Sequence, residues 1–420
     1  VLVFLMSLGF GATIMLASID LVAAYYHIPI APKQQPQLGF MFDGQKYFAN
    51  GLPFGAKANP SIFCRYINLI WLFLMTLCII VFWYVDDCLL IGISESSTAR
   101  AVEITLQVLK FLNCRVNLAK SETTPLRCID YIGIVIDLDM WCLRIRKKTL
   151  EKLRHLTSRI LTPGSTWKVS RLRKRLQSLI GILNFVEVVI RVVRPLKHYF
   201  IGYLRSIAGH EVVTLSGEAS GYLKVINHLI REHPSAPIST RKLDLLSVHN
   251  HSLSTDACET GYGGWAYRAD GTVVYFKGLW KDLEGLPSQL SIADKELLTH
   301  LMAIMVLLPE VLESVRSVDV FIDNQNCVSW INNLRSTVDI YSEAHLQRMK
   351  WLLGYACLQG SESLDIYAHY IPTDENTWAD WLSRPDLTKY FHIAISHCNS
   401  QQVHIPSQWY NNWMLRCENL

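Results

Sequence analysis

Short apolar runs separated by turn residues dominate the first third of the chain and predict β-strands. Their lengths and their content of Val, Ile, Phe and Tyr are typical of strands. The runs between residues 10 and 140 are Ile14 to Leu21, Leu38 to Phe42, Gln45 to Phe48, Ile79 to Tyr84, Leu89 to Ile93 and Tyr131 to Ile136. Between them, Pro60 to about Leu77 and Ser97 to Leu112 have apolar residues at helical spacing. The mixture predicts an α+β domain.

From Lys147 to about Leu204 the pattern becomes helical. One apolar stripe is formed by Leu172, Leu176, Leu179 and Leu183, and the basic residues Arg171, Arg173, Lys174 and Arg175 lie off it. The spacing therefore predicts a helix with a positively charged face.

A second α/β domain is predicted to begin near residue 245, after a linker at His233-Pro234-Ser235-Ala236-Pro237. Strand-like runs alternate there with helical segments. The runs are Leu253 to Thr255, Gly264 to Tyr267, Val273 to Phe276, Val318 to Ile322 and Ile366 to Ile371.

The composition supports folded domains throughout, because half of the 420 residues are hydrophobic and 18% are charged. A single hydrophobic core rarely serves more than about 250 to 300 residues, so two or three domains are expected in this chain. The net charge of +4 is unevenly spread: residues 144–175 hold 12 Lys and Arg against one acid, Glu151. That window carries +11 and the rest of the chain carries −7, so one basic segment lies in an otherwise acidic protein.

Two further features concern the environment of the protein. The 11 cysteines stand singly, without a C-x-x-C pair, which predicts a reduced, intracellular protein of the cytoplasm or nucleus. The apolar run Leu69 to Val85 has 17 residues, the lower limit for a membrane span. It ends at Asp86-Asp87 with no basic anchor on the other side, so we reject a span.

Three aspartates mark the ends of strand-like runs. Asp20 ends one run, and the pair Asp86-Asp87 lies between two others, as in a hairpin turn. Carboxylates on apolar strands are costly to keep charged without a cation, and clusters of oxygen ligands suit Mg²⁺. Two such ions about 3.5 to 4 Å apart can activate the attacking oxygen and stabilise the leaving oxygen in nucleotidyl transfer. The alternative for Asp86-Asp87 alone is an ordinary β-turn.

The residues around these acids resemble the motifs of retroelement reverse transcriptases. Ser18 to Ile30 resembles the first catalytic motif, Leu52 to Phe63 the nucleotide-and-template motif, and Tyr84-Val85-Asp86-Asp87 the metal-binding turn. Val116 to Glu122 resembles the lysine-bearing segment and Tyr131 to Asp137 the primer-gripping hairpin. The His-Ile-Pro-Ile and Leu-Pro-Phe-Gly segments are most similar to those of DIRS-type retrotransposons, with gypsy-type elements next.

The resemblance implies roles for individual residues. Asp20 and Asp86 would be the main metal ligands and Asp87 a weaker one, with the backbone near Leu21 facing the triphosphate. Tyr25 takes the position of an aromatic gate whose ring excludes a ribose 2′-hydroxyl; the alternative is an ordinary half-buried aromatic residue. Lys120 either donates to the leaving pyrophosphate or simply lies on the surface.

A second acidic group follows in the α/β domain, at Asp256, Glu296, Asp323 and Asp380. Four carboxylates could bind two Mg²⁺ ions, although any one of them alone is more often a solvated surface residue. Their surroundings resemble the ribonuclease H domain of the same elements: Ser254-Thr255-Asp256-Ala257, Lys295-Glu296-Leu297-Leu298, Ile322-Asp323-Asn324 and Ala379-Asp380-Trp381-Leu382-Ser383-Arg384.

The basic segment resembles the helical connection of the family over Thr166 to Lys197. Arg171, Arg173, Lys174 and Arg175 would then contact the phosphates of a hybrid duplex and bind it independently of its sequence. A solvated charged face is the alternative.

The resemblance implies a reverse transcriptase palm with partial fingers over residues 1–140 and a basic helical thumb or connection over 141–240. A ribonuclease H-like domain over 245–385 and a C-terminal tail over 386–420 would follow. The implied activities are RNA-directed DNA polymerisation (nucleotidyl transfer) and endonucleolytic cleavage of RNA in hybrids, within a transposable-element polyprotein. The implied cofactor is Mg²⁺, or Mn²⁺ in its place. The implied partners are an RNA template, a DNA primer, an RNA/DNA hybrid and deoxynucleoside triphosphates, with no membrane.

The chain also departs from the family pattern. Family members have a basic fingers region before the first aspartate, and only 19 residues precede Asp20. Ile371-Pro372-Thr373-Asp374 stands where a Gly usually follows the Pro. We therefore expect hybrid cleavage to survive better than polymerisation, and the alternative function is that of a truncated, non-catalytic remnant that only binds nucleic acid.

Overall fold

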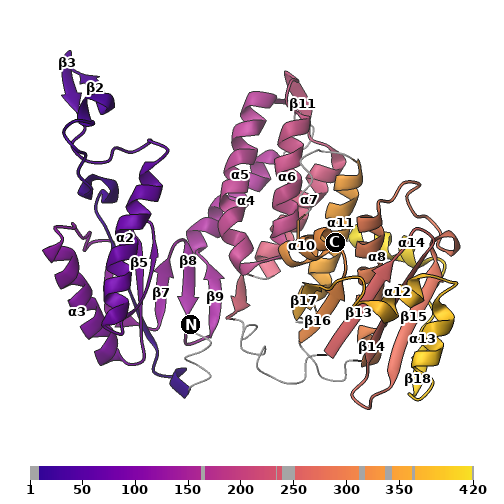
Figure 1. The fold of residues 1–420 in the computed structure, drawn as a ribbon. Helices are drawn as coiled ribbons and strands as arrows, with labels where there is room; N and C mark the ends of the chain where they lie inside the picture. The colour runs from indigo at the N-terminus through magenta and orange to yellow at the C-terminus, as the bar shows by residue number, and fades with distance from the viewer. Residues whose placement is uncertain are drawn as a thin grey trace. The chain divides into compact units, whose positions relative to one another are not determined.

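The computed structural model describes residues 9–161, 166–232, 234–238, 251–311, 317–335, 343–361 and 365–418. The chain forms two compact units, which are taken separately below (Figure 1). Unit 1 comprises residues 1–149 with 235–239, and unit 2 comprises the remainder. Both contain helices and sheets, so the α+β class predicted from the sequence is confirmed.

The main sheet of unit 1 has the strand order β4-β5-β1-β6. Its strands are β1 (Met15–Asp20), β4 (Ile80–Tyr84), β5 (Asp87–Gly92) and β6 (Glu122–Leu126). Successive side chains of β1 point to opposite faces of the sheet. Ala17 and Ile19 pack with helices α2 (Asn59–Thr76) and α3 (Glu95–Phe111), whereas Leu16 packs on the other face with Ile129 and Ile136. The strand carrying Asp20 is therefore buried on both faces.

A second sheet of unit 1 has the order β12-β9-β8-β7. Its strands are β7 (Cys128–Tyr131), β8 (Ile134–Asp137), β9 (Cys142–Ile145) and β12 (Ser235–Pro237). The last of these returns from the end of the expected linker and pairs antiparallel with β9, so this part of the linker is ordered.

A separate hairpin of unit 1 joins β2 (Gly39–Phe42) and β3 (Gln45–Phe48). Its two-residue turn is Asp43-Gly44, with φ of 48° and 70°. An Asp-Gly pair suits this turn because positive φ is least costly for Gly and tolerated by Asp. The short 3₁₀ helices η2 (Ala24–His27) and η3 (Gln35–Leu38) precede it. Figure 1 shows the hairpin projecting away from α2 and the main sheet.

The first part of unit 2 is helical. It contains α4 (Lys147–Ile160, of which the first three residues count with unit 1), α5 (Val169–Val189), α6 (Val193–Ser206) and α7 (Gly217–Glu232), with β10 (Thr166–Lys168) paired to β11 (Val212–Thr214). The predicted apolar stripe on α5 is confirmed, since its four leucines are fully buried.

A six-stranded sheet with the order β17-β16-β13-β14-β15-β18 forms the centre of the rest of unit 2. The strands are β13 (His251–Ala257), β14 (Gly261–Tyr267), β15 (Val273–Leu279), β16 (Ser317–Ile322), β17 (Asp365–Tyr370) and β18 (Ser400–Gln402). The first three form an antiparallel meander, and β16, β17 and β18 pair in parallel with their neighbours.

Helices cover both faces of this sheet. One core cluster contains residues of α8 (Ile292–Val306), α9 (Leu308–Val311), α10 (Gln325–Asn333), α11 (Glu343–Ser361) and α14 (Trp409–Glu418). A second cluster packs α12 (Thr377–Ser383) and α13 (Thr388–Ala394) on side chains of β15. Residues 388–418, within the segment expected as a tail, thus contribute two helices and a strand to this unit, and Trp413 is fully buried.

The apolar run Leu69 to Val85 does not form one helix. It is divided between the end of α2 and β4, with Cys78 between them at a φ of 58°. In the described part of the chain, no helix is both long and apolar enough to cross a membrane.

Candidate functional site

The acids of unit 1 meet where β1 ends beside the β4–β5 hairpin. Asp20 and Asp87 are direct Cα partners in the antiparallel register, and the hairpin turn consists of Val85 and Asp86. The backbone N–H of Leu21 donates to the Asp86 carbonyl at 3.2 Å. The pairing brings Asp20 to the adjacent pair Asp86-Asp87, which follows it by 66 and 67 positions in the sequence.

The turn that carries Asp86 is strained. Val85 has a φ of 56°, in the left-handed region where a β-branched residue is rarely found. Such strain costs about 1–3 kcal/mol and persists only where the surrounding structure requires it. The Tyr131 hydroxyl donates to the Asp87 carbonyl at 3.2 Å and helps to hold the turn.

Electrostatics link the unit 1 acids to the predicted lysine. Burial and then the charges of Asp86 and Asp20 raise the pKa of Asp87, and Lys120 opposes this rise. Lys120 is exposed and near enough to act on the acidic group, and Arg146, which the sequence reading did not single out, acts in the same direction.

Tyr25 is half-buried and lies in an aromatic contact between two predicted motifs. Its ring centroid is 5.1 Å from that of Phe54 and 5.4 Å from that of the buried Phe63. Phe54 is exposed and also contacts Tyr26. The ring of Tyr25 is thus fixed by packing, which a steric gate requires and which a purely structural aromatic residue would also show.

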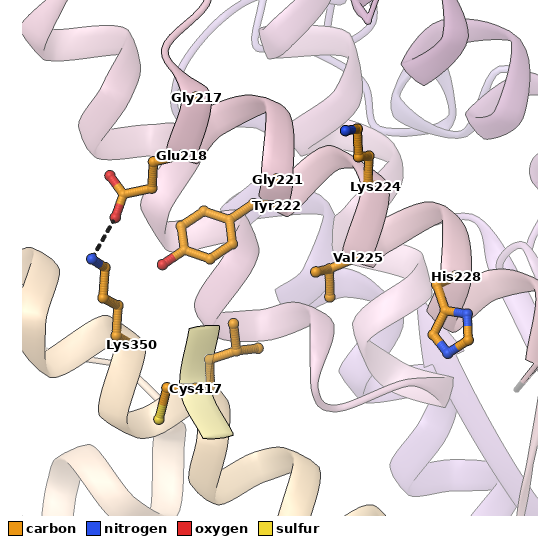
Figure 2. A pocket seen from close by; sticks show the side chains of 10 residues that line it. Gly217, Glu218, Gly221, Tyr222, Lys224, Val225, His228, Lys350 and Cys417 are labelled. Atoms are coloured by element: carbon orange, nitrogen blue, oxygen red, sulfur yellow. Dashed lines mark ion pairs between the residues drawn. The ribbon is translucent and has the colours of Figure 1, made fainter. Parts of the chain in front are cut away.

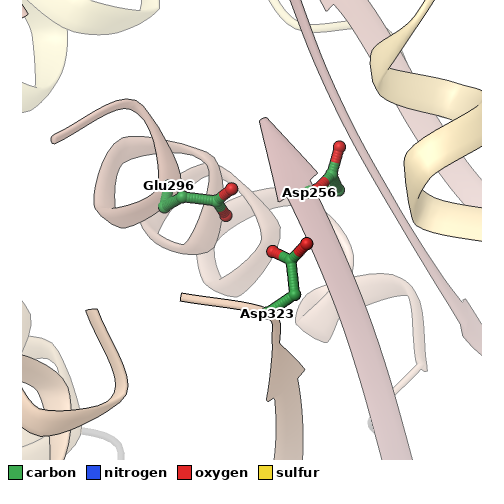
Figure 3. A group of neighbouring side chains, drawn as sticks. All are labelled: Asp256, Glu296 and Asp323. Carbon is green, nitrogen blue, oxygen red and sulfur yellow. The ribbon is translucent and has the colours of Figure 1, made fainter. Parts of the chain in front are cut away.

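Three acids of unit 2 converge closely (Figure 3). Asp256 comes from β13, Glu296 from α8, and Asp323 directly follows β16. One carboxylate oxygen of each lies within 4.8 Å of the others. Within the described ranges this is the one group of three or more His, Cys, Asp or Glu side chains that converges so closely. The parallel pairing of β13 with β16 aligns the strand ends that carry two of the acids.

The electrostatics of this cluster favour a cation. Burial, followed by the charges of Asp323 and Asp380, raises the pKa of Asp256 to about 7. Burial, followed by Asp256 and Asp323, raises the pKa of Glu296 to about 10. Asp256 Oδ2 and Glu296 Oε2 are buried without a hydrogen-bond partner. An oxygen-only set with two orphaned buried oxygens fits Mg²⁺, which would compensate the repulsion.

Asp380 lies beside the cluster on α12, but outside the group of three that converges most closely. Burial raises its pKa, the charge of Arg384 opposes the rise, and Asp323 adds to it. Arg384 forms an ion pair with Asp380 at 2.6 Å.

Two glycines of β14 allow α12 to approach the sheet. A Cβ on Gly261 would lie 2.3 Å from the Ser383 carbonyl oxygen, and one on Gly263 would lie 2.4 Å from the Leu382 Cβ. Gly263 is the direct partner of Asp256 in the register. The absence of side chains at these positions therefore places Asp380 beside Asp256.

The four basic residues of α5 differ in their environments. Arg171, Arg173 and Lys174 are exposed. The guanidinium of Arg175 instead stacks over the Trp167 ring at 4.3 Å and donates to the Arg159 carbonyl at 3.1 Å. Three of the residues thus form an exposed basic face, whereas the fourth joins α5 to β10 and α4.

Cavities of unit 2 lie apart from the acids. One, of about 550 Å³, is lined by α7, α11 and α14, with an ion pair between Glu218 and Lys350 at 3.2 Å (Figure 2). Another, of about 680 Å³, is lined by residues 280–281, 286–291 and 294–295 with Arg348. None of the seven predicted acids lines either of these two cavities.

Some residues at the unit 2 site have no simple signal in the sequence. The Thr373 hydroxyl donates to Asp323 Oδ2 at 2.9 Å, and the Ser383 hydroxyl donates to the Asp380 carbonyl at 3.1 Å. Thr373 lies in the segment that departs from the family pattern. The ion pair of Arg384 with Asp380 could have been expected from the sequence, because residues four positions apart are neighbours on a helix.

The sequence is similar to a reverse transcriptase family model and to parts of a transposon and a viral protein. Residues 11–136 match the family model described as reverse transcriptase (RNA-dependent DNA polymerase). The retrovirus-related Pol polyprotein from transposon gypsy of Drosophila melanogaster is 22% identical over 387 residues, which cover 90% of this chain and 33% of the polyprotein. Protein P of heron hepatitis B virus is 26% identical over 171 residues, 40% of this chain and 21% of that protein.

Among solved structures, a foamy viral protease-reverse transcriptase in complex with RNA/DNA hybrid has a TM-score of 0.47 and 16% identity. The similarity covers 86% of this chain and 44% of that one. The chain spans about a third of the gypsy polyprotein and a fifth of the viral protein.

Proposed function

We propose, from the premise that residues 11–136 are a retrotransposon-type reverse transcriptase region, that the chain is an RNA-directed DNA polymerase with ribonuclease H activity. Unit 1 would extend a DNA primer on an RNA template with deoxynucleoside triphosphates. Unit 2 would cleave the RNA strand of the resulting hybrid. The observation that carries the second activity is the convergence of Asp256, Glu296 and Asp323 within 4.8 Å.

In unit 1, Asp20 and Asp86 would hold Mg²⁺, or Mn²⁺ in its place, with Asp87 in support. The strained Val85 places Asp86 beside the end of β1. Such backbone strain lowers the stability of the fold and is found mainly at functional sites. Lys120, whose charge acts on Asp87, would donate to the leaving pyrophosphate. The backbone after Asp20, at Leu21, would lie beside the incoming nucleotide.

The gate assigned to Tyr25 has a measurable consequence. Tyr25→Ala should admit ribonucleotides and keep the metal ligands, because the ring that leaves no space for a 2′-hydroxyl is removed. A clash of a few kcal/mol corresponds to several decades at about 1.4 kcal/mol per tenfold, so the ratio of ribo- to deoxynucleotide incorporation in primer extension should rise by about 10²-fold or more. Asp86→Asn serves as the inactive control. Loss of deoxynucleotide incorporation with unchanged selectivity would make Tyr25 a packing residue for Phe63.

In unit 2, Asp256, Glu296, Asp323 and Asp380 would hold the cations. When bound, Mg²⁺ would activate a water and stabilise the leaving oxygen of a phosphodiester. The raised pKa values, about 7 for Asp256 and about 10 for Glu296, mean that near neutral pH the metal-free site keeps the proton of Glu296 and part of the proton of Asp256. They release these protons as a cation binds, so metal affinity should increase with pH. Arg384 and Thr373 would orient Asp380 and Asp323.

The exposed basic face of α5 would bind the hybrid through its phosphates. Exchanging Arg171, Arg173 and Lys174 for Gln should weaken hybrid binding and reduce the slope of log affinity against log salt by up to about 2–3, at ~0.9 per duplex phosphate contact. Binding titrations at several salt concentrations measure this slope.

Arg175→Gln is the matched control for this prediction. It removes the same charge from the same helix, but from a side chain held by Trp167 and the Arg159 carbonyl. We expect a lower melting temperature and a smaller change in slope than for any one of the other three. If the folded triple variant kept the same slope of log affinity against log salt, the basic face of α5 would be a solvated surface that does not contact phosphates.

A further inference from the structure

The solvent-facing side of α2 exposes large apolar side chains. Leu69 is 67% exposed, Leu72 53%, Phe73 51%, Met75 45% and Ile62 41%. The other side of the same helix packs in the core of unit 1. Apolar surface that remains exposed over a contiguous area usually marks a contact site.

The exposed side of α2 has the spacing of a helix-pairing seam. Exposed residues recur there at intervals of three and four positions and therefore form one stripe along the helix. The stripe consists of Ile62, Arg65, Leu69, Leu72 and Thr76. A helix that is apolar on two sides is typical of one that packs against two neighbours. The core of unit 1 supplies one of these neighbours.

The apolar area of this side is close to what a weak protein contact needs. A large apolar side chain presents about 150–200 Å² when fully exposed, so the five apolar side chains named above leave roughly 400–500 Å² in water. Contact between two identical faces would bury about twice this area, roughly 800–1,000 Å², which is near the lower limit for a specific interface. The area therefore suits a reversible pair of identical chains.

The charge on α2 favours a second copy of the chain as the occupant. Arg65 is the one charged residue between positions 59 and 85, and the last turn of α2 contains no basic residue. In an antiparallel pair, Arg65 of each helix lies beside the C-terminal turn of the other, where the helix dipole is negative. A helix that lies on a lipid surface is usually rich in Lys and Arg, which α2 lacks.

From these observations we infer that the solvent-facing side of α2 is a self-association surface, on which two copies of the chain pair their α2 helices antiparallel about a two-fold axis. At the centre, Leu69 packs against Leu72 of the partner subunit, with Phe73 beside them and Arg65 toward the ends. A two-fold contact between identical faces closes on itself, so the product is a dimer and not a filament. The inference does not rest on the proposed activities.

The test measures the mass of the nuclease-treated full chain by sedimentation equilibrium, at concentrations up to about 100 μM, where weak interfaces are populated. We expect a reversible monomer–dimer equilibrium that high salt largely preserves, because the contact is apolar. Leu69→Gln with Leu72→Gln should raise the dissociation constant by at least about 100-fold, since four buried leucine side chains are lost, two from each copy. Arg65→Gln should raise it by about 3- to 10-fold. The melting temperature of the dilute double variant should be unchanged, because both leucines are exposed in the monomer.

Leu415→Gln is the matched control, since this leucine of α14 is 59% exposed outside α2, and it should leave the dissociation constant unchanged. A wild-type chain that stays monomeric would overturn the inference, as would a double variant that dimerises as tightly as the wild type. Growth into ever larger species would indicate a contact between unlike surfaces and would contradict two-fold pairing. If a monomeric wild type bound phosphatidylcholine–phosphatidylserine vesicles and the double variant did not, the face would belong to a lipid surface instead. None of these measurements depends on catalysis.

Discussion

Asp323→Asn should abolish cleavage of the RNA strand of an RNA/DNA hybrid, with a loss of at least about 10³-fold, or ~4 kcal/mol in the barrier. Asp323 converges with Asp256 and Glu296 within 4.8 Å, so its replacement removes one of the anionic ligands that would hold the cations. Hybrid degradation with Mg²⁺ by the purified chain measures the effect. Equal cleavage by variant and wild type would contradict the proposal that unit 2 is a nuclease.

The same substitution should stabilise the metal-free protein. Burial and mutual repulsion raise the pKa of Asp256 to about 7 and that of Glu296 to about 10, so both groups bind protons more tightly in the folded chain than in the unfolded chain. Their ionisation therefore costs folding free energy. The contribution of these two groups to the free energy of unfolding is greatest below about pH 4, where both are protonated. It is lost as the pH rises through about 7 for Asp256 and about 10 for Glu296.

The uncharged amide introduced by Asp323→Asn would remove part of this repulsion, since the charge of Asp323 contributes to both shifts. We expect a higher melting temperature without Mg²⁺, a weaker decline of stability with pH, and a smaller increase of melting temperature on adding Mg²⁺. A substitution that merely damaged the fold would lower the melting temperature in every buffer. A variant with the full Mg²⁺-dependent increase would show that the cluster is not a cation site.

Gly263→Ala should have the second large effect, although it adds only a methyl group. The new Cβ would lie 2.4 Å from the Leu382 Cβ and 2.8 Å from the Leu382 carbonyl carbon, so α12 must move away from β14. Overpacking of this kind costs about 2–3 kcal/mol. A displacement of about 1 Å at Asp380 can reduce catalysis by about 10²-fold. Thermal unfolding and hybrid cleavage should therefore both be impaired.

Gly181→Ala is the matched control for this prediction. Gly181 lies within α5, and a Cβ there would meet nothing within 4 Å. Alanine at an open helical position stabilises by about 0.5–1 kcal/mol relative to glycine. Gly181→Ala should unfold at a slightly higher temperature and cleave normally. Normal cleavage by Gly263→Ala would mean that Asp380 does not need its place beside Asp256.

Local periodicity made several elements predictable. The buried stripe of α5, the α+β class and the hairpin before and after Asp86-Asp87 follow from apolar residues at spacings of two or of three and four. The candidate acids were chosen on different grounds, from motifs that resemble those of reverse transcriptases and ribonuclease H domains; Asp20, Asp86, Asp87, Asp256 and Asp323 lie at or beside strand ends, whereas Glu296 and Asp380 lie within helices. The length of the apolar run Leu69 to Val85 could not show that a turn at Cys78 divides it into helix and strand.

The sequence by itself determined which residues are available: five acids beside strand-like runs and two in other segments, a helix with one apolar stripe, and a basic segment in an acidic chain. Only the tertiary structure decided which of them meet. Asp256, Glu296 and Asp323 converge because β13 and β16 pair in parallel and α8 packs on the same sheet. The four basic residues of α5 look alike in the sequence, yet Arg175 is separated from the other three by its contact with Trp167. The physical reason is that spacing along the chain sets the face on which a side chain lies, whereas the partner across the core depends on strand register and close packing between segments far apart in sequence.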